Sequence, residues 1–273
     1  MILIRSCEGF DEFEACVQLE IETWGYDESD IIPRKSFLLG QKIGGQVIGA
    51  FDTGLPGARP EGGPECLVGF AYSLPGIKSG ANGPSPYLHS HMLAVKESHR
   101  NRGVGVQLKL KQRDEALARG IRLMEWTFDP LEIKNAFLNI HKLGAIVCTY
   151  RVDFYGISSS RLQGGLPTDR LVAEWILDSQ RVKGILANRR AAGCIIEERI
   201  RVPAEIYHWK SSEAGRQRAH ALQLENRQKF QQAFSRGLVV LGFERDVHGN
   251  GIFELGPPNQ PDSGIESQRF ENL

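Results

Sequence analysis

The chain has 273 residues, of which 41% are hydrophobic and 24% are charged. This composition is ordinary for one large or two modest globular domains. Lysine and arginine total 33, as do aspartate and glutamate, so the formal net charge is zero. A dedicated nucleic-acid-binding protein needs a basic excess for its phosphate contacts, so the charge balance argues against one.

Cysteine usage and apolar runs predict the compartment. The five cysteines stand far apart and form no Cys-x-x-Cys pair, which argues against a zinc site and a disulfide framework. The apolar run over residues 1–5 is too short for a signal peptide, and no stretch approaches the roughly 20 apolar residues of a membrane span. We therefore expect a cytoplasmic protein with no metal and no membrane partner.

The first 95 residues predict two helices among four strands. Apolar residues spaced by three and four predict a first helix that ends at Gly25, and a shorter helix is expected over 32–39. Loops rich in glycine and proline are expected over 52–64 and 76–86. The expected strands cover residues 2–6, 46–51, 67–74 and 87–95.

Next comes a turn over 96–102, a helix over 104–118 and a strand over 123–128. The helix after this strand has a clear start signal. Asp129 is a good N-cap, Pro130 suits the first helical position, and Glu132 completes an Asp-x-x-Glu capping box. We expect this helix to end at Leu143-Gly144.

The rest of the chain predicts further strands and one long helix. After the strands over 145–154 and 171–177, a long polar helix is expected to begin at Ser211 or Ser212 and to end at residue 235. The other expected strands cover 194–202, 205–210, 238–244 and 251–255. Alternating strands and helices indicate an α/β fold. We expect a core over 1–178, an α/β extension over 179–256 and a disordered tail over 257–273.

A glycine-rich turn joins the expected strand over 87–95 to its following helix. Its residues are Arg100, Asn101, Arg102, Gly103, Val104, Gly105 and Val106. Arg100, Arg102 and the following Lys109 are expected to add positive charge there. Two glycines allow a tight turn that directs N–H groups into one concavity at the positive end of the helix, which is a phosphate-binding arrangement. Leu108 stands where a dinucleotide fingerprint needs its third glycine, and no Gly-Lys-Ser/Thr of a P-loop is present.

The pattern Arg-x-x-Gly-x-Gly, after a strand that ends in Leu93-Ala94-Val95, resembles the acetyl-CoA motif of the GNAT acetyltransferases. The order of elements from Ile2 to about Leu177 also resembles the GNAT core. The resemblance implies a mixed, mostly antiparallel sheet with a splayed parallel strand pair and helices on both faces. The alternative is that the two glycines only make a strand-to-helix turn.

The resemblance also implies where acetyl-CoA binds. Its diphosphate is expected on the N–H groups of residues 102–106, and the backbone of Leu93 and Val95 is expected to bind the pantetheine arm. The strand around 126–128 is the expected parallel neighbour. Asn135 or Asn139 is expected to make polar contacts with the coenzyme.

Catalytic residues are less clear, because Ile140 stands where many GNAT members carry a tyrosine acid. The leaving thiolate is then protonated by His141, by a tyrosine such as Tyr150, or by water. For the base we expect His89 or His91, which lie two apart and therefore on one face of a strand. Alternatively, both histidines are packed or surface groups.

The loop before the last core strand could shape an acceptor pocket. Arg170 could hold a substrate carboxylate, or form a surface pair with Asp169. We expect an N-acetyltransferase that transfers an acetyl group from acetyl-CoA to a small-molecule amine. The alternatives are a non-catalytic acyl-CoA-binding module and a protein-lysine acetyltransferase. A monomer and a homodimer both stay open.

Overall fold

The computed structural model describes residues 1–80, 83–189 and 194–258. Its contacts divide the chain into two compact units. The first comprises Met1–Lys78, Pro84–Met124 and Ser159–Arg161, and the second comprises Ser79–Gly83, Glu125–Ser158 and the chain from Leu162 onward. The predicted boundaries at residues 178 and 256 stay a prediction, and the tail lies outside the described residues from 259 onward.

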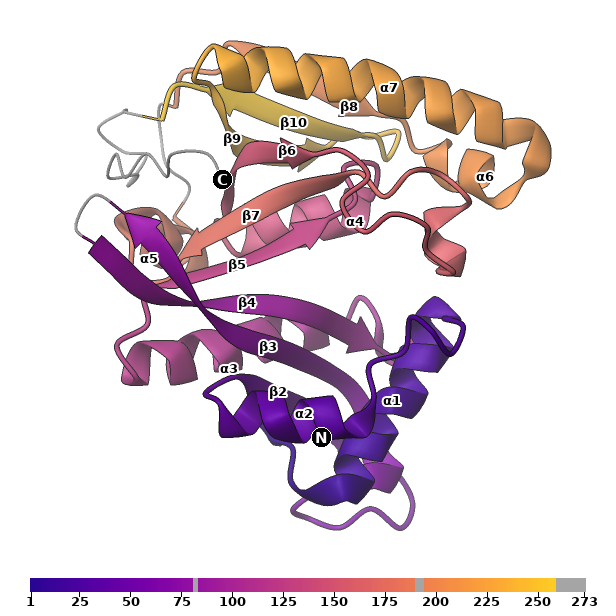
Figure 1. The fold of residues 1–273 in the computed structure, drawn as a ribbon, viewed down its shortest axis with the longest axis vertical. Helices are drawn as coiled ribbons and strands as arrows, with labels where there is room; N and C mark the ends of the chain where they lie inside the picture. Colours follow the sequence, from indigo (N-terminus) through magenta and orange to yellow (C-terminus); the bar gives the residue numbers. More distant parts are fainter. Residues whose placement is uncertain (81–82, 190–193, 259–273) are drawn as a thin grey trace. The chain divides into compact units, whose positions relative to one another are not determined.

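The first unit contains four strands in the order β1-β2-β3-β4 (Figure 1). These are β1 (Ile2–Ser6), β2 (Gln46–Asp52), β3 (Leu67–Gly80) and β4 (Gly83–Val95). β2 pairs antiparallel with both β1 and β3. The loop predicted over 76–86 is wrong in its described part, because β3 and β4 continue into it. Gly76 serves packing there, since a Cβ on it would lie 2.5 Å from the Tyr87 ring.

Helices cover both faces of this unit's strands. On β2, Val47 and Phe51 pack in one apolar cluster with α1 (Gly9–Trp24) and α2 (Arg34–Lys42). The alternate residues Ile48 and Ala50 pack in a second cluster with α3 (Val104–Ala118). Because successive side chains of a strand point to opposite faces, α3 lies on the face opposite α1 and α2. Helices on both faces were predicted, and this is confirmed for the first unit.

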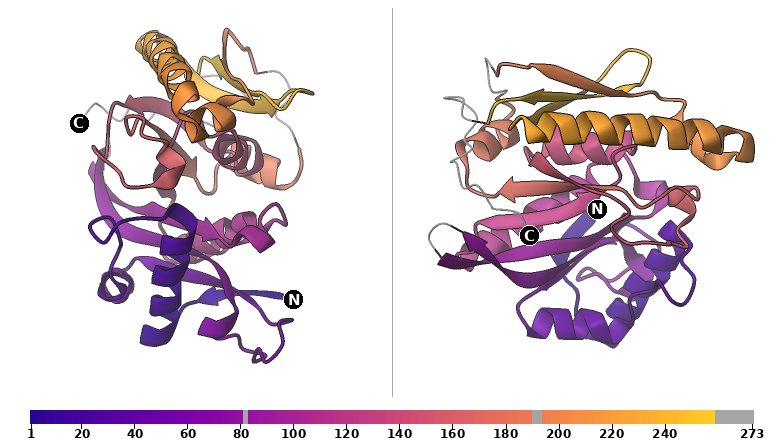
Figure 2. Two further views of the ribbon diagram at one scale, coloured as in Figure 1. Left: turned by 90° about the vertical axis from the view of Figure 1, so that its right-hand side faces the viewer. Right: turned by 45° about the horizontal axis from the view of Figure 1, so that its top comes forward.

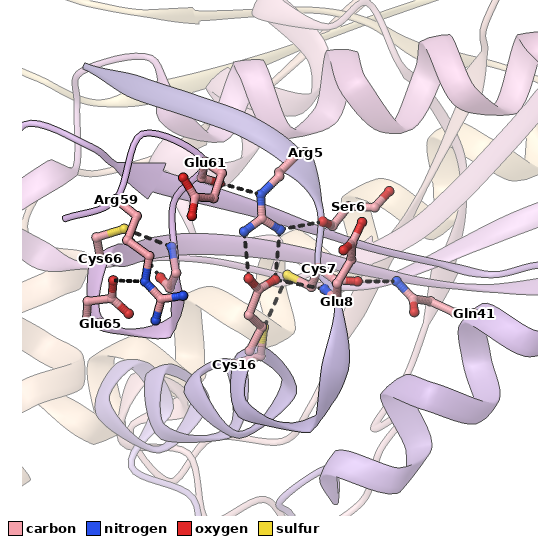
Figure 3. Close-up of polar contacts among 12 residues, drawn as sticks. Arg5, Ser6, Cys7, Glu8, Cys16, Gln41, Arg59, Glu61, Glu65 and Cys66 are labelled. Atoms are coloured by element: carbon pink, nitrogen blue, oxygen red, sulfur yellow. Dashed lines mark hydrogen bonds and ion pairs between the residues drawn. The ribbon is translucent and has the colours of Figure 1, made fainter.

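The N-terminal part of α1 is fixed by polar contacts to the end of β1 (Figure 3). The Arg5 guanidinium donates two hydrogen bonds to the Glu12 carboxylate, at 2.6 and 2.8 Å. The Cys7 and Cys16 sulfurs lie 3.9 Å apart in the buried interior. All five cysteines are free thiols.

The second unit contains six strands in the order β5-β7-β6-β9-β10-β8. Pairing of β7 and β9 with β6 and of β8 and β9 with β10 is antiparallel, so the mixed, mostly antiparallel α/β class is confirmed. The predicted parallel partners over 93–95 and 126–128 fall in different units, so their pairing stays a prediction. The strands are β5 (Leu123–Phe128), β6 (Ile146–Arg151), β7 (Arg170–Ile176), β8 (Glu198–Val202), β9 (Val239–Arg245) and β10 (Gly251–Gly256).

The helices of the second unit include one predicted element, α7 (Glu213–Ser235), and two that sequence patterns missed. The long helix α7 lies along β8 (Figure 2) and is capped by the predicted Ser212, whose Oγ accepts from Gly215 N at 3.2 Å. The strand predicted over 205–210 is wrong. Those residues form α6 (Ile206–Ser211), because Pro203 ends β8 and its carbonyl accepts from Ile206 N. Sequence patterns did not predict α5 (Gln180–Leu186).

A buried carboxylate joins α7 to the strands of the second unit. Asp169 is fully buried and accepts two hydrogen bonds from Arg227 on α7, at 2.8 and 2.9 Å. Asp169 also accepts from the Tyr150 hydroxyl at 2.6 Å and from Asp153 N at 3.0 Å. Burial, followed by this contact with Asp169, raises the pKa of Tyr150 far above its ordinary value.

A second buried carboxyl, Glu20 on α1, accepts a hydrogen bond from the backbone. Its Oε1 accepts from Ile32 N at 3.0 Å, which ties the α1–α2 connection back to the helix. The side chain is fully buried. Burial raises the pKa of Glu20 from 4.5 to about 7, and the bond from Ile32 opposes the shift. The folded protein therefore holds a proton here that the unfolded chain releases.

We predict that this carboxyl makes stability fall as the pH rises. The folded state binds the proton more tightly, so the stabilisation is complete below about pH 4.5 and is lost as the pH rises through about 7. The loss is roughly 1–3 kcal/mol in the free energy of unfolding. Urea denaturation at pH 5, 6, 7 and 8 should show this loss in the parent and not in Glu20→Gln. The exposed Glu22→Gln is the control, and equal pH dependence in all three proteins would contradict the account.

Candidate functional site

The glycine turn ends in an open helix N-terminus. Asn101 and Gly103 have left-handed backbones, with φ of 61° and 81°. Gly103 is the N-cap of α3 and has no side chain with which to cap it, and the first intrahelical bond runs from Gln107 N to Gly103 O. The N–H groups of residues 104–106 thus lie at the positive end of the helix with no side-chain cap from its N-cap residue.

The backbone conformation of Gly103 favours glycine, and the space beside it is open. Its φ of 81° is a conformation that side-chain-bearing residues rarely adopt. A Cβ placed there would meet open space, since the nearest atom is the Gln107 side-chain nitrogen at 4.0 Å. Space beside three helix-terminal N–H groups suits an anion such as a phosphate or diphosphate.

Two arginines contribute positive charge at the turn, whereas the predicted contribution of Lys109 is wrong. Arg100 and Arg102 are exposed, and Arg100 Nε donates to Val95 O at 2.9 Å. Lys109 is buried, and its Nζ donates to Ser90 Oγ at 2.7 Å. Burial lowers the pKa of Lys109 far below its ordinary value. The side chain therefore adds no charge to the turn and instead bonds α3 to β4.

A hydrogen bond that the sequence did not predict anchors the turn. His99, in the short helix η2 (Glu97–His99), lies 3.1 Å from Asp52 at the end of β2. Asp52 also contacts the Met1 amino group at 3.2 Å and Gly54 N at 3.0 Å. The hydrogen bond with His99, followed by that from Gly54, lowers the pKa of Asp52 to about 2. The carboxylate therefore stays charged and holds the turn in place.

β4 is irregular just before the turn. Ser90 bonds to Gln112 on α3 and therefore faces that helix. His91 contacts the Tyr72 ring on the opposite face, at 6.4 Å between ring centres, and the next residue, Met92, packs in the same cluster as Tyr72. Two successive residues on one face break the alternation of a regular strand. A bulge of this kind bends a strand and interrupts its hydrogen-bond ladder.

The structure brings the two candidate bases together. The rings of His89 and His91 lie 6.3 Å apart, as expected for residues on one strand face. His91 is exposed to solvent, and His89 is half-buried. Partial desolvation, and then the charge of His89, lowers the pKa of His91 from 6.5. The His91 imidazole is therefore neutral at pH 7 and able to accept a proton.

In the second unit, the helix after β5 differs from its prediction. It begins as α4 (Ile133–Ala136) and continues as the π-helical segment η3 (Phe137–Lys142). The wider π turn separates the two candidate asparagines, so Asn135 is exposed and Asn139 is buried. Ile140 is also buried. The His141 ring stacks on Phe137, and its Nδ1 bonds to Phe243 O at 3.1 Å.

The predicted capping box on this helix is wrong. Asp129 accepts from Leu131 N at 2.8 Å in a preceding turn, and its other oxygen pairs with Lys210 at 2.7 Å. The Glu132 carboxylate accepts from the Tyr207 hydroxyl at 2.7 Å, so it does not reach back to the cap. Both partners come from α6, about 75 residues further along the chain, and no local pattern could have predicted them.

Arg170 is already engaged by its own loop. Its guanidinium donates to Asp169 O at 2.9 Å and to Gln163 Oε1 at 3.1 Å, and it lies 5.4 Å from the centre of the Tyr155 ring. Asp169 pairs with Arg227, so the alternative of an exposed Asp169–Arg170 pair is wrong. The role of Arg170 toward a substrate carboxylate stays a prediction.

Two further searches of the described residues gave negative results. In this part of the chain, no group of three or more His, Cys, Asp or Glu side chains is placed to hold a metal ion. Within the same residues, no helix has the length and apolar character needed to cross a membrane.

No protein-family model and no curated protein sequence matches the chain. Solved structures of acetyltransferases are similar to it. The ribosomal-protein-S18-alanine N-acetyltransferase of Escherichia coli shares 16% identity, with 65% of this chain and 94% of the other covered and a TM-score of 0.47. NAA60 of Arabidopsis thaliana shares 16% identity, with 64% and 97% covered and a TM-score of 0.49. A GNAT family acetyltransferase of Elizabethkingia anophelis shares 14% identity, with 64% and 97% covered and a TM-score of 0.42.

Proposed function

We propose that the protein is an N-acetyltransferase that uses acetyl-CoA and a small-molecule amine. The observation that carries the proposal is the open N-terminus of α3, where Gly103 has a left-handed backbone and free space above it. The exposed Arg100 and Arg102 add the positive charge that a diphosphate requires. The N–H groups of residues 102–106 would hold the diphosphate.

The bulge in β4 supports a role for the strand end that follows it. Where a ladder is interrupted, main-chain groups are free to bind an extended ligand, as an added strand does at a sheet edge. The backbone of Leu93 and Val95, on either side of Ala94, is therefore our candidate for the pantetheine arm. Arg100 already engages the Val95 carbonyl, at 2.9 Å. The exposed Asn135 is a better candidate for a coenzyme contact than the buried Asn139.

Bound acetyl-CoA supplies a thioester that an amine attacks, forming a C–N bond as the C–S bond breaks. The amine arrives mostly as an ammonium ion at pH 7, so a base must first remove a proton. His91 suits this step, because its ring is neutral and accessible, and His89 stands beside it. His141 is our candidate acid: its Nδ1–H donates to Phe243 O, which fixes the ring. Tyr150 fits less well, because its hydroxyl is buried and donates to Asp169.

A second candidate function is a non-catalytic acyl-CoA-binding module. It is favoured by the burial of Ile140, where an acid is expected, and by the engagement of the Tyr150 hydroxyl. Thiol release from acetyl-CoA across a panel of small amines and one lysine peptide separates the functions. Coenzyme binding without turnover on any amine supports the module, and turnover on the peptide alone supports a protein acceptor.

We predict that Gly103→Glu weakens CoA binding by at least roughly tenfold, because a carboxylate would then occupy the anion site. The matched control is Gly120→Glu at the other end of α3, where φ is also positive, at 76°, and nothing lies within 4 Å of the Cβ position. Both variants carry the same backbone strain of about 1 kcal/mol. Calorimetric titration with CoA should find parent-like affinity for Gly120→Glu. Equal affinities for all three proteins would remove the basis of the proposal.

We predict that His91→Ala lowers kcat/KM for the amine by roughly 100-fold, which is typical for the loss of a general base. In the parent, the acidic limb of the pH–rate profile should lie below pH 6.5, since the pKa of His91 is lowered. This limb should vanish in the variant. The exposed His220→Ala on α7 is the control. An unchanged rate in both His91→Ala and His89→Ala would show that neither histidine is the base.

A further inference from the structure

Two buried oxygen atoms on α1 have no hydrogen-bond partner among the described residues. They are Glu20 Oε2 and Thr23 Oγ1. Residues three apart on a helix lie on the same face, so both oxygens belong to one side of the last turn of α1. Buried polar atoms are almost always hydrogen-bonded, so a pair of unpaired neighbours indicates a missing binding partner.

When Glu20 is ionised, its missing partner must be a donor, because a carboxylate can only accept hydrogen bonds. The Thr23 hydroxyl oxygen can accept as well, and Ile32 N already donates to the other carboxyl oxygen of Glu20. Among titratable groups of this cluster, burial raises the pKa of Tyr72, and the hydrogen bond with Cys7 followed by burial raises the pKa of Cys16, so neither is charged at pH 7. His91 lies beside Tyr72 and is neutral. These groups supply no positive charge for an ionised Glu20. The Arg161 guanidinium lies against Gly25 at the end of α1, but only burial and the bond from Ile32 act on the pKa of Glu20.

Apolar side chains lie next to the two unpaired oxygens and form a wall beside them. Trp24, Ile31 and Ile32 are partly buried against the apolar cluster of α1 and α2. This cluster contains Tyr72, whose ring contacts His91, so the pair lies under the same face of the first unit's strands as the candidate base.

The connection over 25–33 follows the pair in the chain, and polar contacts tie it to Glu20 and to Ser159. Besides the bond from Ile32 N to Glu20, Asp27 N donates to Ser159 Oγ at 2.9 Å. Ser159 in turn donates twice to Asp30, at 2.7 and 2.8 Å. Gly25, with φ of 63°, begins the connection. Connections between helices open locally more readily than the elements they join, and such an opening would give a small ligand access to the pair.

We propose that Glu20 and Thr23 form the polar end of a subsite for the amino group of the acceptor, bound as a primary ammonium. This inference rests on the proposed function. A primary ammonium has three N–H donors, enough for both oxygens, and its charge compensates an ionised carboxylate. The apolar wall would contact the carbon skeleton, so the preferred acceptor is a primary amine on an aliphatic or aromatic body. Glu20 and Thr23 are positioning residues, and His91 accepts the proton.

Methylammonium chloride is the probe, and thermal unfolding of the full chain is the readout. At pH 8 it should raise the melting temperature of the parent by roughly 2–4 °C more than equal concentrations of sodium chloride or tetramethylammonium chloride, once the site is largely filled. Glu20→Gln and Thr23→Val should lose this difference, and the exposed Glu22→Gln should keep it. Below pH 7 the affinity for methylammonium should fall by up to about tenfold per pH unit, because binding must then displace the Glu20 proton.

Two results would overturn the subsite. An equal effect of the three salts on the parent overturns the subsite and indicates that the two oxygens hold a buried water. An effect of methylammonium that survives in Glu20→Gln and Thr23→Val also overturns it. CoA binding, measured in the same proteins, should be unchanged by either substitution. A parent protein that binds CoA but not methylammonium therefore refutes this inference alone. A parent protein that does not bind CoA refutes the proposed function.

Discussion

The N-terminus of α3 is the physical constraint on which the proposed chemistry depends. A helix leaves its first N–H groups without intrahelical partners, and most helices satisfy them with a side chain at the N-cap. Here the N-cap is Gly103, whose left-handed backbone closes the turn without a side chain. The free N–H groups and the positive end of the helix dipole are thereby offered to an anion.

The surrounding structure makes this turn rigid before any ligand binds. On one side, Asp52 pairs with His99 and so joins the turn to the end of β2. On the other, buried polar side chains fix α3 to the strands, with Ser90 donating to Gln112 and Lys109 donating to Ser90. Preorganised donors need little rearrangement when charge arrives, which is the property that makes such sites effective.

The second unit shows how the predicted extension supports the helix after β5. α6 supplies Lys210 and Tyr207 to Asp129 and Glu132 at the start of that helix, and Arg227 on α7 neutralises the buried Asp169. Removing one partner of a buried pair leaves an uncompensated charge, which is strongly destabilising. The extension is therefore a structural part of the second unit.

What the sequence predicts well is what neighbouring residues decide. The bounds of α3 and β5 were predicted without error, because glycine turns and apolar periodicity are local signals. Two of the failures involve partners that are distant in the chain or a choice of helix face. The capping box failed because α6 occupies both carboxylates, and Lys109 was assigned to the turn because helical spacing alone does not show which face is buried. Glu20 gave no signal at all, since its unusual state comes from complete burial in an apolar cluster.

The most direct test follows the backbone amides themselves. In ¹⁵N–¹H spectra, saturating CoA should shift the amide resonances of Gly103, Val104 and Gly105 downfield, as charge-assisted hydrogen bonds form with the diphosphate. Pantetheine, which has the same arm without the diphosphate, should leave these three resonances in place. Equal responses to the two ligands, or none to CoA, would contradict the account.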